Sequence, residues 1–190
     1  MTAKERSLLQ QLDRIVRSEQ VRAQILPIVE RVRAELTRKQ NALMAWEPIA
    51  LTLFGDALQA AIHSGWVFIL RAGANTGAER HPNSHQRMMS FEGTGNLQTD
   101  AESADRSARA PFDIAWKSNV LVSDIEASLE QRWISIPQNV WHRPVIPKGT
   151  DWVVVSFHTV PTKQLIEERP PDSAAGAMKR TLYLAPDRNG

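Results

Sequence analysis

The residues of this chain that could do chemistry lie in two short stretches. The first, residues 73–93, contains Glu79, His81 and Gln86, and the second ends in His142. Residues two apart on a strand point to the same side, so Glu79 and His81 can face one point. Gln86 would begin the returning strand, and His142 would arrive from another hairpin. One carboxylate, two imidazoles and an amide oxygen suit a divalent transition metal. The sequence therefore predicts a metal pocket inside β-structure.

Short strands must position these side chains. Runs rich in β-branched and aromatic residues predict strands at residues 66–70, 87–91, 119–122, 132–136 and 152–157. Gly, Pro, Asn, Asp and Ser mark turns between them. No helical pattern alternates with these strands, which favours a sandwich or a barrel. Residues 99–110 are expected to form an exposed loop. The tail from Pro170 is expected to be loosely ordered, although residues 181–184 could add a further edge strand or a partner contact.

A helical region precedes the strands. Apolar residues recur at helical spacing along residues 3–44, with charged residues between them. Pro27 has no backbone N–H to donate, so we expect it in the first turn of the second helix or at a break. The apolar stripes must pack against something. The two helices either lie on the β-structure or pair with another subunit.

The first stretch resembles a motif of the cupin family. That motif reads Gly, five residues, His, one residue, His, three or four residues, Glu, six residues, Gly. Here Gly73, Glu79, His81, Gln86 and Gly93 fit every spacing. Glu79 stands where the family has its first His, and Gln86 stands where it has Glu. The family's ligands carry one negative charge, and so do these residues. Here the charge lies on Glu79 instead of at the position of Gln86.

The second stretch resembles the second cupin motif. Pro137, Asn139 and His142 fit its spacing, whereas Gln131 and Ile146 replace its outer Gly and Asn. Asn139 takes the place of a glycine, and Asn tolerates positive φ better than most residues. The resemblance covers about residues 65–160.

The resemblance implies a mainly β fold, a double-stranded β-helix (a cupin or jelly-roll barrel) with an N-terminal α-helical extension. On this basis residues 1–50 form the helical extension, residues 51–165 form the barrel, and residues 166–190 form a C-terminal tail.

The resemblance also implies a metal held by Glu79, His81, Gln86 and His142. Two His and one carboxylate form the face found in non-haem Fe(II) oxygenases, so Fe is the first expectation, with Mn, Ni or Zn as alternatives. The function implied is a metal-binding cupin, with a dioxygenase acting on a small organic substrate as its catalytic form. Two departures at four ligand positions keep open a non-catalytic binding or sensing protein, or a structural role, with a degenerate or empty site. Enzymatic activity and catalytic residues stay open.

Further residues are candidates for the pocket wall: Arg71, Met88, Trp141 and His158. Arg71 could clamp a carboxylate, with solvated surface as the alternative. A buried histidine such as His158 is more often hydrogen-bonded in the core than a ligand. His85 could replace Gln86 if the loop before it shifts, and otherwise points to solvent or caps that loop.

Composition limits the remaining classes. The chain has 190 residues, a net charge of +2 and no cysteine, which excludes disulfides and thiolate ligands. Without a basic stripe, nucleic acid is not an expected partner. No apolar run reaches membrane-spanning length, and the N-terminus does not read as a signal segment. We expect no membrane association, a cytoplasmic location, a small-molecule ligand, no organic cofactor and a homodimer.

Overall fold

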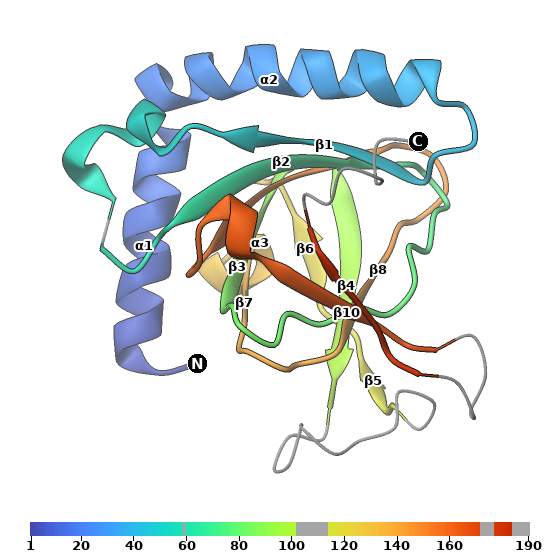
Figure 1. The fold of residues 1–190 in the computed structure, drawn as a ribbon. Helices are drawn as coiled ribbons and strands as arrows, with labels where there is room; N and C mark the ends of the chain where they lie inside the picture. The colour runs from blue at the N-terminus through green and yellow to red at the C-terminus, as the bar shows by residue number, and fades with distance from the viewer. Residues whose placement is uncertain (59, 102–113, 172–176, 184–190) are drawn as a thin grey trace.

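The computed structural model describes residues 1–58, 60–101, 114–171 and 177–183. Its ribbon shows three layers (Figure 1). Helices α1 (Ala3–Arg17) and α2 (Glu19–Arg38) cover one face of a sheet. A second sheet lies against the other face of that sheet. The candidate site lies between the two sheets, away from the helices.

The break between the helices occurs at Ser18. The Ser18 hydroxyl accepts a hydrogen bond from the Val21 amide at 3.4 Å and so caps α2. The expectation for Pro27 is wrong: Pro27 lies inside α2, well past its first turn. Burial of the apolar face of α2, including Ile25 and Val29, against the sheet holds the helix together despite the missing N–H. No helix in the described ranges is long and apolar enough to cross a membrane.

In the described part of the chain, the strands pair antiparallel into a five-stranded sheet, a four-stranded sheet and a separate hairpin. The five-stranded sheet has the order β1 (Met44–Ile49), β2 (Ser64–Leu70), β9 (Trp152–His158), β3 (Gln86–Glu92), β7 (Trp133–Ile136). The four-stranded sheet pairs β4 (Thr94–Asp100) with β5 (Trp116–Lys117), β6 (Val120–Val122) and β8 (His142–Val145). The hairpin is β10 (Ile166–Arg169) with β11 (Lys179–Leu182). Short helical segments are η1 (Leu51–Ala57), α3 (Leu129–Arg132) and η2 (Thr162–Gln164).

Two apolar cores follow from the alternation of side chains along the central strands. On β2, Val67 and Ile69 pack toward the helices, whereas Trp66 and Phe68 pack toward the second sheet. The second core joins the sheets, because Trp66 shares it with Leu97 of β4. The sheets approach closely there. A Cβ on Gly95 would lie 2.1 Å from the Trp152 ring, so this position admits only glycine.

The predicted fold class is confirmed: the protein is mainly β, with facing antiparallel sheets and N-terminal helices. All five predicted strands are present, as β2, β3, β6, β7 and β9. The edge strand expected at residues 181–184 is present as part of β11, with Leu184 outside the described residues. The loop predicted at residues 99–110 begins later, because Thr99 and Asp100 belong to β4, and residues 102–110 lie outside the described residues.

Candidate metal centre

Backbone pairing brings the two motifs together. The Glu79 amide donates to the His142 carbonyl, and the His142 amide donates to the Glu79 carbonyl, each at 2.9 Å. On its other edge the same segment pairs with β10, through Arg80 and Glu168. The motif segment therefore lies between β8 and β10. The side chains of Glu79 and His142 leave the backbone next to each other.

The turns around the motifs need unusual backbone angles. Gly73 and Gly93, which frame the first motif, have φ of 76° and 78°. Asn139 is the one described non-glycine residue with positive φ, at 63°. It occupies the position where the second cupin motif has glycine. Asn tolerates this conformation better than most residues, which is why it can stand in place of glycine here.

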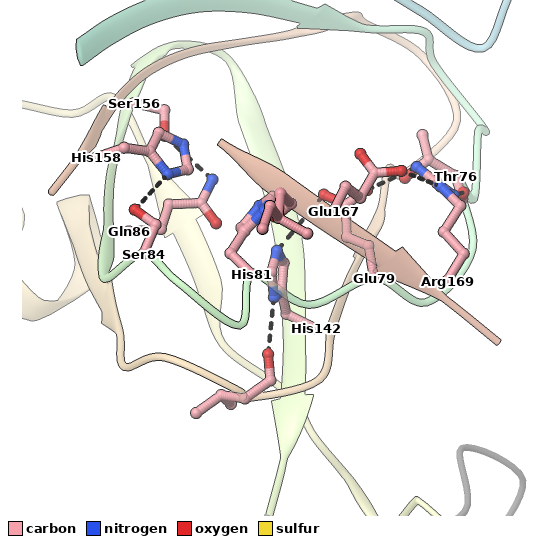
Figure 2. A network of polar contacts seen from close by, with 12 residues as sticks. Thr76, Glu79, His81, Ser84, Gln86, His142, Ser156, His158, Glu167 and Arg169 are labelled. Carbon is pink, nitrogen blue, oxygen red and sulfur yellow. Dashed lines mark hydrogen bonds and ion pairs between the residues drawn. The ribbon is translucent and has the colours of Figure 1, made fainter. Parts of the chain in front are cut away.

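Glu79, His81 and His142 form a compact donor set. One ligand atom of each lies within 4.8 Å of the others, and all three residues are buried. His81 Nδ1 is 3.0 Å from the Ile166 carbonyl, and His142 Nδ1 is 3.0 Å from the Val140 carbonyl (Figure 2). Carbonyls accept hydrogen bonds, so both Nδ1 atoms carry the proton and both Nε2 atoms are free to ligate. The sequence prediction that these three residues converge is confirmed.

The donor chemistry fits a metal. His142 Nε2 is buried with no hydrogen-bond partner among the described residues. It lies 3.5 Å from Glu79 Oε1, near the spacing of about 3 Å expected for two donors on one first-row metal. A buried unpaired imidazole nitrogen is costly by about 1–3 kcal/mol unless something accepts its lone pair. A cation between Glu79, His81 and His142 would do so.

Glu79 is held as a carboxylate. Burial alone would raise its pKa, but the positive charge of His142 in its protonated form and that of Arg169 outweigh this effect and lower the pKa to about 2. Arg169 Nη2 donates to Glu79 Oε2 at 2.6 Å, which leaves Oε1 facing His142. Arg169 Nε donates to Glu167 Oε1, also at 2.6 Å (Figure 2). Arg169 therefore fixes the rotation of the Glu79 carboxylate.

His81 is held neutral. Burial and the neighbouring His142 both lower its pKa. A metal needs neutral imidazole and ionised carboxylate as ligands. The site thus provides the protonation states that metal binding requires.

Gln86 begins β3, as predicted, and lines a cavity of ≈ 30 Å³ together with Glu79 and His142. Its amide nitrogen donates to Ser156 Oγ at 3.1 Å, and its buried amide oxygen has no hydrogen-bond partner among the described residues. Met88 lines the same cavity, as expected for a pocket residue. A cavity of this size holds one or two waters.

The other predicted pocket residues lie at different places. The His158 ring lies beside His81, with centroids 5.1 Å apart. Arg71 donates to backbone carbonyls at the end of α2, including Leu36 at 2.8 Å. Trp141 is buried beneath the Arg80 guanidinium, which lies 4.8 Å from its ring centroid. Arg71 and Trp141 thus make these contacts instead of lining the cavity beside Glu79 and His142.

His85 does not replace Gln86. Its Nε2 is 2.7 Å from Ser135 Oγ, toward α1 and away from the triad. The alternation that brings Gln86 inward places His85 on the other side.

Three residues of the site were missed by the sequence analysis: Glu167, Arg169 and Tyr183. Glu167 and Arg169 belong to β10, and Tyr183 follows β11 and lines the cavity. All three fall in residues 166–190, which read as a tail. The available signal was the two-residue spacing of Glu167 and Arg169, which places them on one side of a strand.

Comparison with known proteins supplies no function. No family model matches the chain, and no curated protein matches its sequence. Solved structures with a similar fold include an oxalate oxidase in complex with the substrate analogue glycolate, at 13% identity over 63% of this chain and 52% of that one, with a TM-score of 0.45. The capsular polysaccharide assembling protein CapF from Staphylococcus aureus matches at 12% identity over 73% of this chain and 32% of that one (TM-score 0.44). Oxalate decarboxylase from Lactobacillus farciminis matches at 11% identity over 63% and 29% (TM-score 0.44).

The match spans about half of the oxalate oxidase chain and about a third of the other two. At these identities and TM-scores the matches carry no activity over to this chain. The resemblance to cupins rests on this chain's own features: the spacing of both motifs, the facing antiparallel sheets and the convergence of Glu79, His81 and His142.

Proposed function

We propose that this chain is a cupin-type metalloprotein that binds one divalent first-row transition metal through Glu79, His81 and His142. The observation that carries the proposal is the buried Nε2 of His142, which has no hydrogen-bond partner among the described residues and lies 3.5 Å from a charged carboxylate oxygen of Glu79. Fe(II) is the metal that best suits a face of two imidazoles and one carboxylate, with Mn, Ni and Zn as competitors.

The catalytic form of this proposal is a dioxygenase acting on a small organic substrate. A face of three protein ligands leaves coordination positions open, and the metal would supply the activation of oxygen. The protein's own part would be to exclude water and orient the substrate. Apolar side chains cover the cavity from several sides, among them Phe68, Leu97 and Val154, and Tyr183 adds a phenol.

The size of the cavity restricts the substrate. A volume of ≈ 30 Å³ is far below the roughly 300–1,000 Å³ typical of pockets for drug-sized ligands. A space of this volume suits a metal-bound water or a diatomic molecule. A larger substrate would require the wall formed by Met44 and Tyr183 to move. We therefore place the substrate among very small organic molecules.

A second candidate is a binding or sensing protein without catalysis. The ion pair between Arg169 and Glu79 favours it, because Arg169 already offsets the buried carboxylate. In that case a small ligand should raise the melting temperature even with chelator present. A ligand effect that disappears with chelator would count against this candidate. Under both proposals we expect the chain to form a homodimer and to lie in the cytoplasm.

Metal analysis tests the main proposal. The purified chain, reconstituted separately with Fe(II), Mn(II), Ni(II) and Zn(II), should retain about one ion per chain with at least one of them. His81→Ala and His142→Ala should each abolish retention. His85→Ala is the matched control, because His85 contacts Ser135 outside the site and should leave retention unchanged. A wild-type chain that stays empty with all four metals would overturn the proposal.

A further inference from the structure

Gln86 carries the other buried polar atom of the cavity with no partner among the described residues, its amide oxygen. The amide nitrogen donates to Ser156 Oγ at 3.1 Å, and Ser156 lies on the neighbouring strand β9. Which end of an amide faces a cavity depends on the hydrogen bonds made by the other end. The orientation of Gln86 can therefore be derived from the contacts of Ser156.

Ser84 contacts the ring of His158 on the side away from Ser156. The Ser84 hydroxyl accepts from the Thr159 amide at 3.2 Å and donates to the His85 carbonyl at 3.3 Å. A hydroxyl has one proton to give. When that proton is given to the His85 carbonyl, the contact of 3.2 Å between Ser84 Oγ and His158 Nδ1 is made by a proton on the histidine.

The tautomer of His158 fixes the next two groups. The two ring nitrogens of His158 face the hydroxyls of Ser84 and Ser156, and a neutral ring donates a proton to one of them and accepts a proton from the other. With the proton on Nδ1, Nε2 is an acceptor. It takes the proton of the Ser156 hydroxyl at 3.4 Å. Because its own proton goes to His158, Ser156 Oγ can only accept a hydrogen bond from Gln86. The group of Gln86 that can donate this bond is the amide NH₂.

We propose that the chain Ser84–His158–Ser156 is a positioning device that turns the amide oxygen of Gln86 toward the metal held by Glu79, His81 and His142. Figure 2 shows His158, Ser156 and Gln86 grouped on one side of His81. This inference rests on the proposed metal site. It assigns His158 and Ser156 to metal binding although neither contacts the metal.

The direction of the hydrogen bonds from Ser84 to Gln86 matters for metal binding. An amide oxygen is an acceptor that a cation binds, whereas an amide NH₂ presents two protons and opposes a cation. The opposite tautomer of His158 would reverse both hydrogen bonds and place the NH₂ in the cavity. That tautomer would take the Ser84 proton away from the His85 carbonyl, so the hydrogen bond between Ser84 and this carbonyl opposes it.

The test measures Co(II) affinity and the visible spectrum of the Co(II)-loaded chain. Gln86→Leu removes the oxygen, and Ser156→Ala removes the group that orients it. Each should weaken Co(II) binding by about 10–100-fold and shift the spectrum in the same direction. Ser156→Thr, which keeps a hydroxyl, should restore both. Adding Ser156→Ala to Gln86→Leu should cause no further loss, because the oriented group is gone.

Ser90→Ala is the control. Ser90 is a buried serine of β3 whose hydroxyl contacts Trp152 and Gly93. It makes no contact in the series of hydrogen bonds that leads from Ser84 to Gln86. It should leave affinity and spectrum unchanged, and thermal melting should show that every variant is folded. Wild-type affinity and spectrum in Ser156→Ala would overturn the inference while the metal site stands. A wild-type chain that binds no metal at all would overturn the proposed function itself.

Discussion

At the scale of the residue, the candidate metal centre contains buried charged side chains that compensate one another. Glu79 and Glu167 share Arg169, which donates to each at 2.6 Å. Removing one partner of a buried ion pair leaves an uncompensated charge. A metal beside Glu79 would supply part of the missing positive charge. Arg169 and the metal therefore act on the same carboxylate.

Arg169→Met should lower the free energy of unfolding of the metal-free protein by about 3 kcal/mol. The loss should be smaller with saturating Zn(II), because the bound cation offsets Glu79. Urea unfolding with and without Zn(II) measures both values. Arg180→Met is the control: Arg180 is 60% exposed and lies 3.7 Å from Glu168, so the change should cost less than about 1 kcal/mol. Equal losses with and without Zn(II) would show that Arg169 and the metal do not share Glu79.

At the scale of the element, helix α1 is attached to the central sheet by polar contacts as well as by its apolar face. Asp13 accepts from Trp133 Nε1 at 2.8 Å and from Arg132 at 2.6 Å. Glu5 accepts from Arg87 at 2.7 Å and from Ser135 at 2.7 Å. These contacts lie on the side of the sheet opposite the metal centre. The helices should thus support stability without forming the site.

Asp13→Ala should therefore lower the free energy of unfolding by about 3 kcal/mol, because Arg132 and the Trp133 N–H lose a buried acceptor. Metal stoichiometry of the folded variant should be unchanged. Glu30→Ala is the matched control on α2: Glu30 is 70% exposed and should change the free energy by less than about 0.5 kcal/mol. Loss of metal from folded Asp13→Ala would mean that the helices help to form the site.

The sequence predicts the elements whose pattern is apolar and misses those whose pattern is polar. β2 and β9 are buried on both faces, and their continuous apolar runs identify them. β10 reads Ile-Glu-Glu-Arg, yet Glu167 is fully buried because Arg169 pairs with it. Hydropathy carries no sign of such a strand, since the compensating charge is known only once the chain is folded. Glu79, His81 and His142 were found through motif spacing, whereas the partners on β10 were not.

At the scale of the whole molecule, stability depends on pH through the neutral histidines between the sheets. Burial lowers the pKa of both His81 and His158, so below their ordinary value of 6.5 the unfolded chain binds protons that the native chain does not. Their contribution is complete above pH 6.5 and falls as the pH decreases. Glu79, with a pKa lowered from 4.5 to about 2, keeps its full contribution until the pH falls below 4.5.

The free energy of unfolding of the metal-free protein should thus decrease between pH 6.5 and pH 5, by up to about 1.4 kcal/mol per pH unit for each histidine. His158→Gln should flatten this dependence, whereas the same change at the exposed His63 should not. Urea unfolding across this range measures the slope. The metal-loaded protein should show a steeper decrease, because protons displace the metal from His81 and His142. A flat profile in the metal-free protein would mean that the histidines are solvated in the native state.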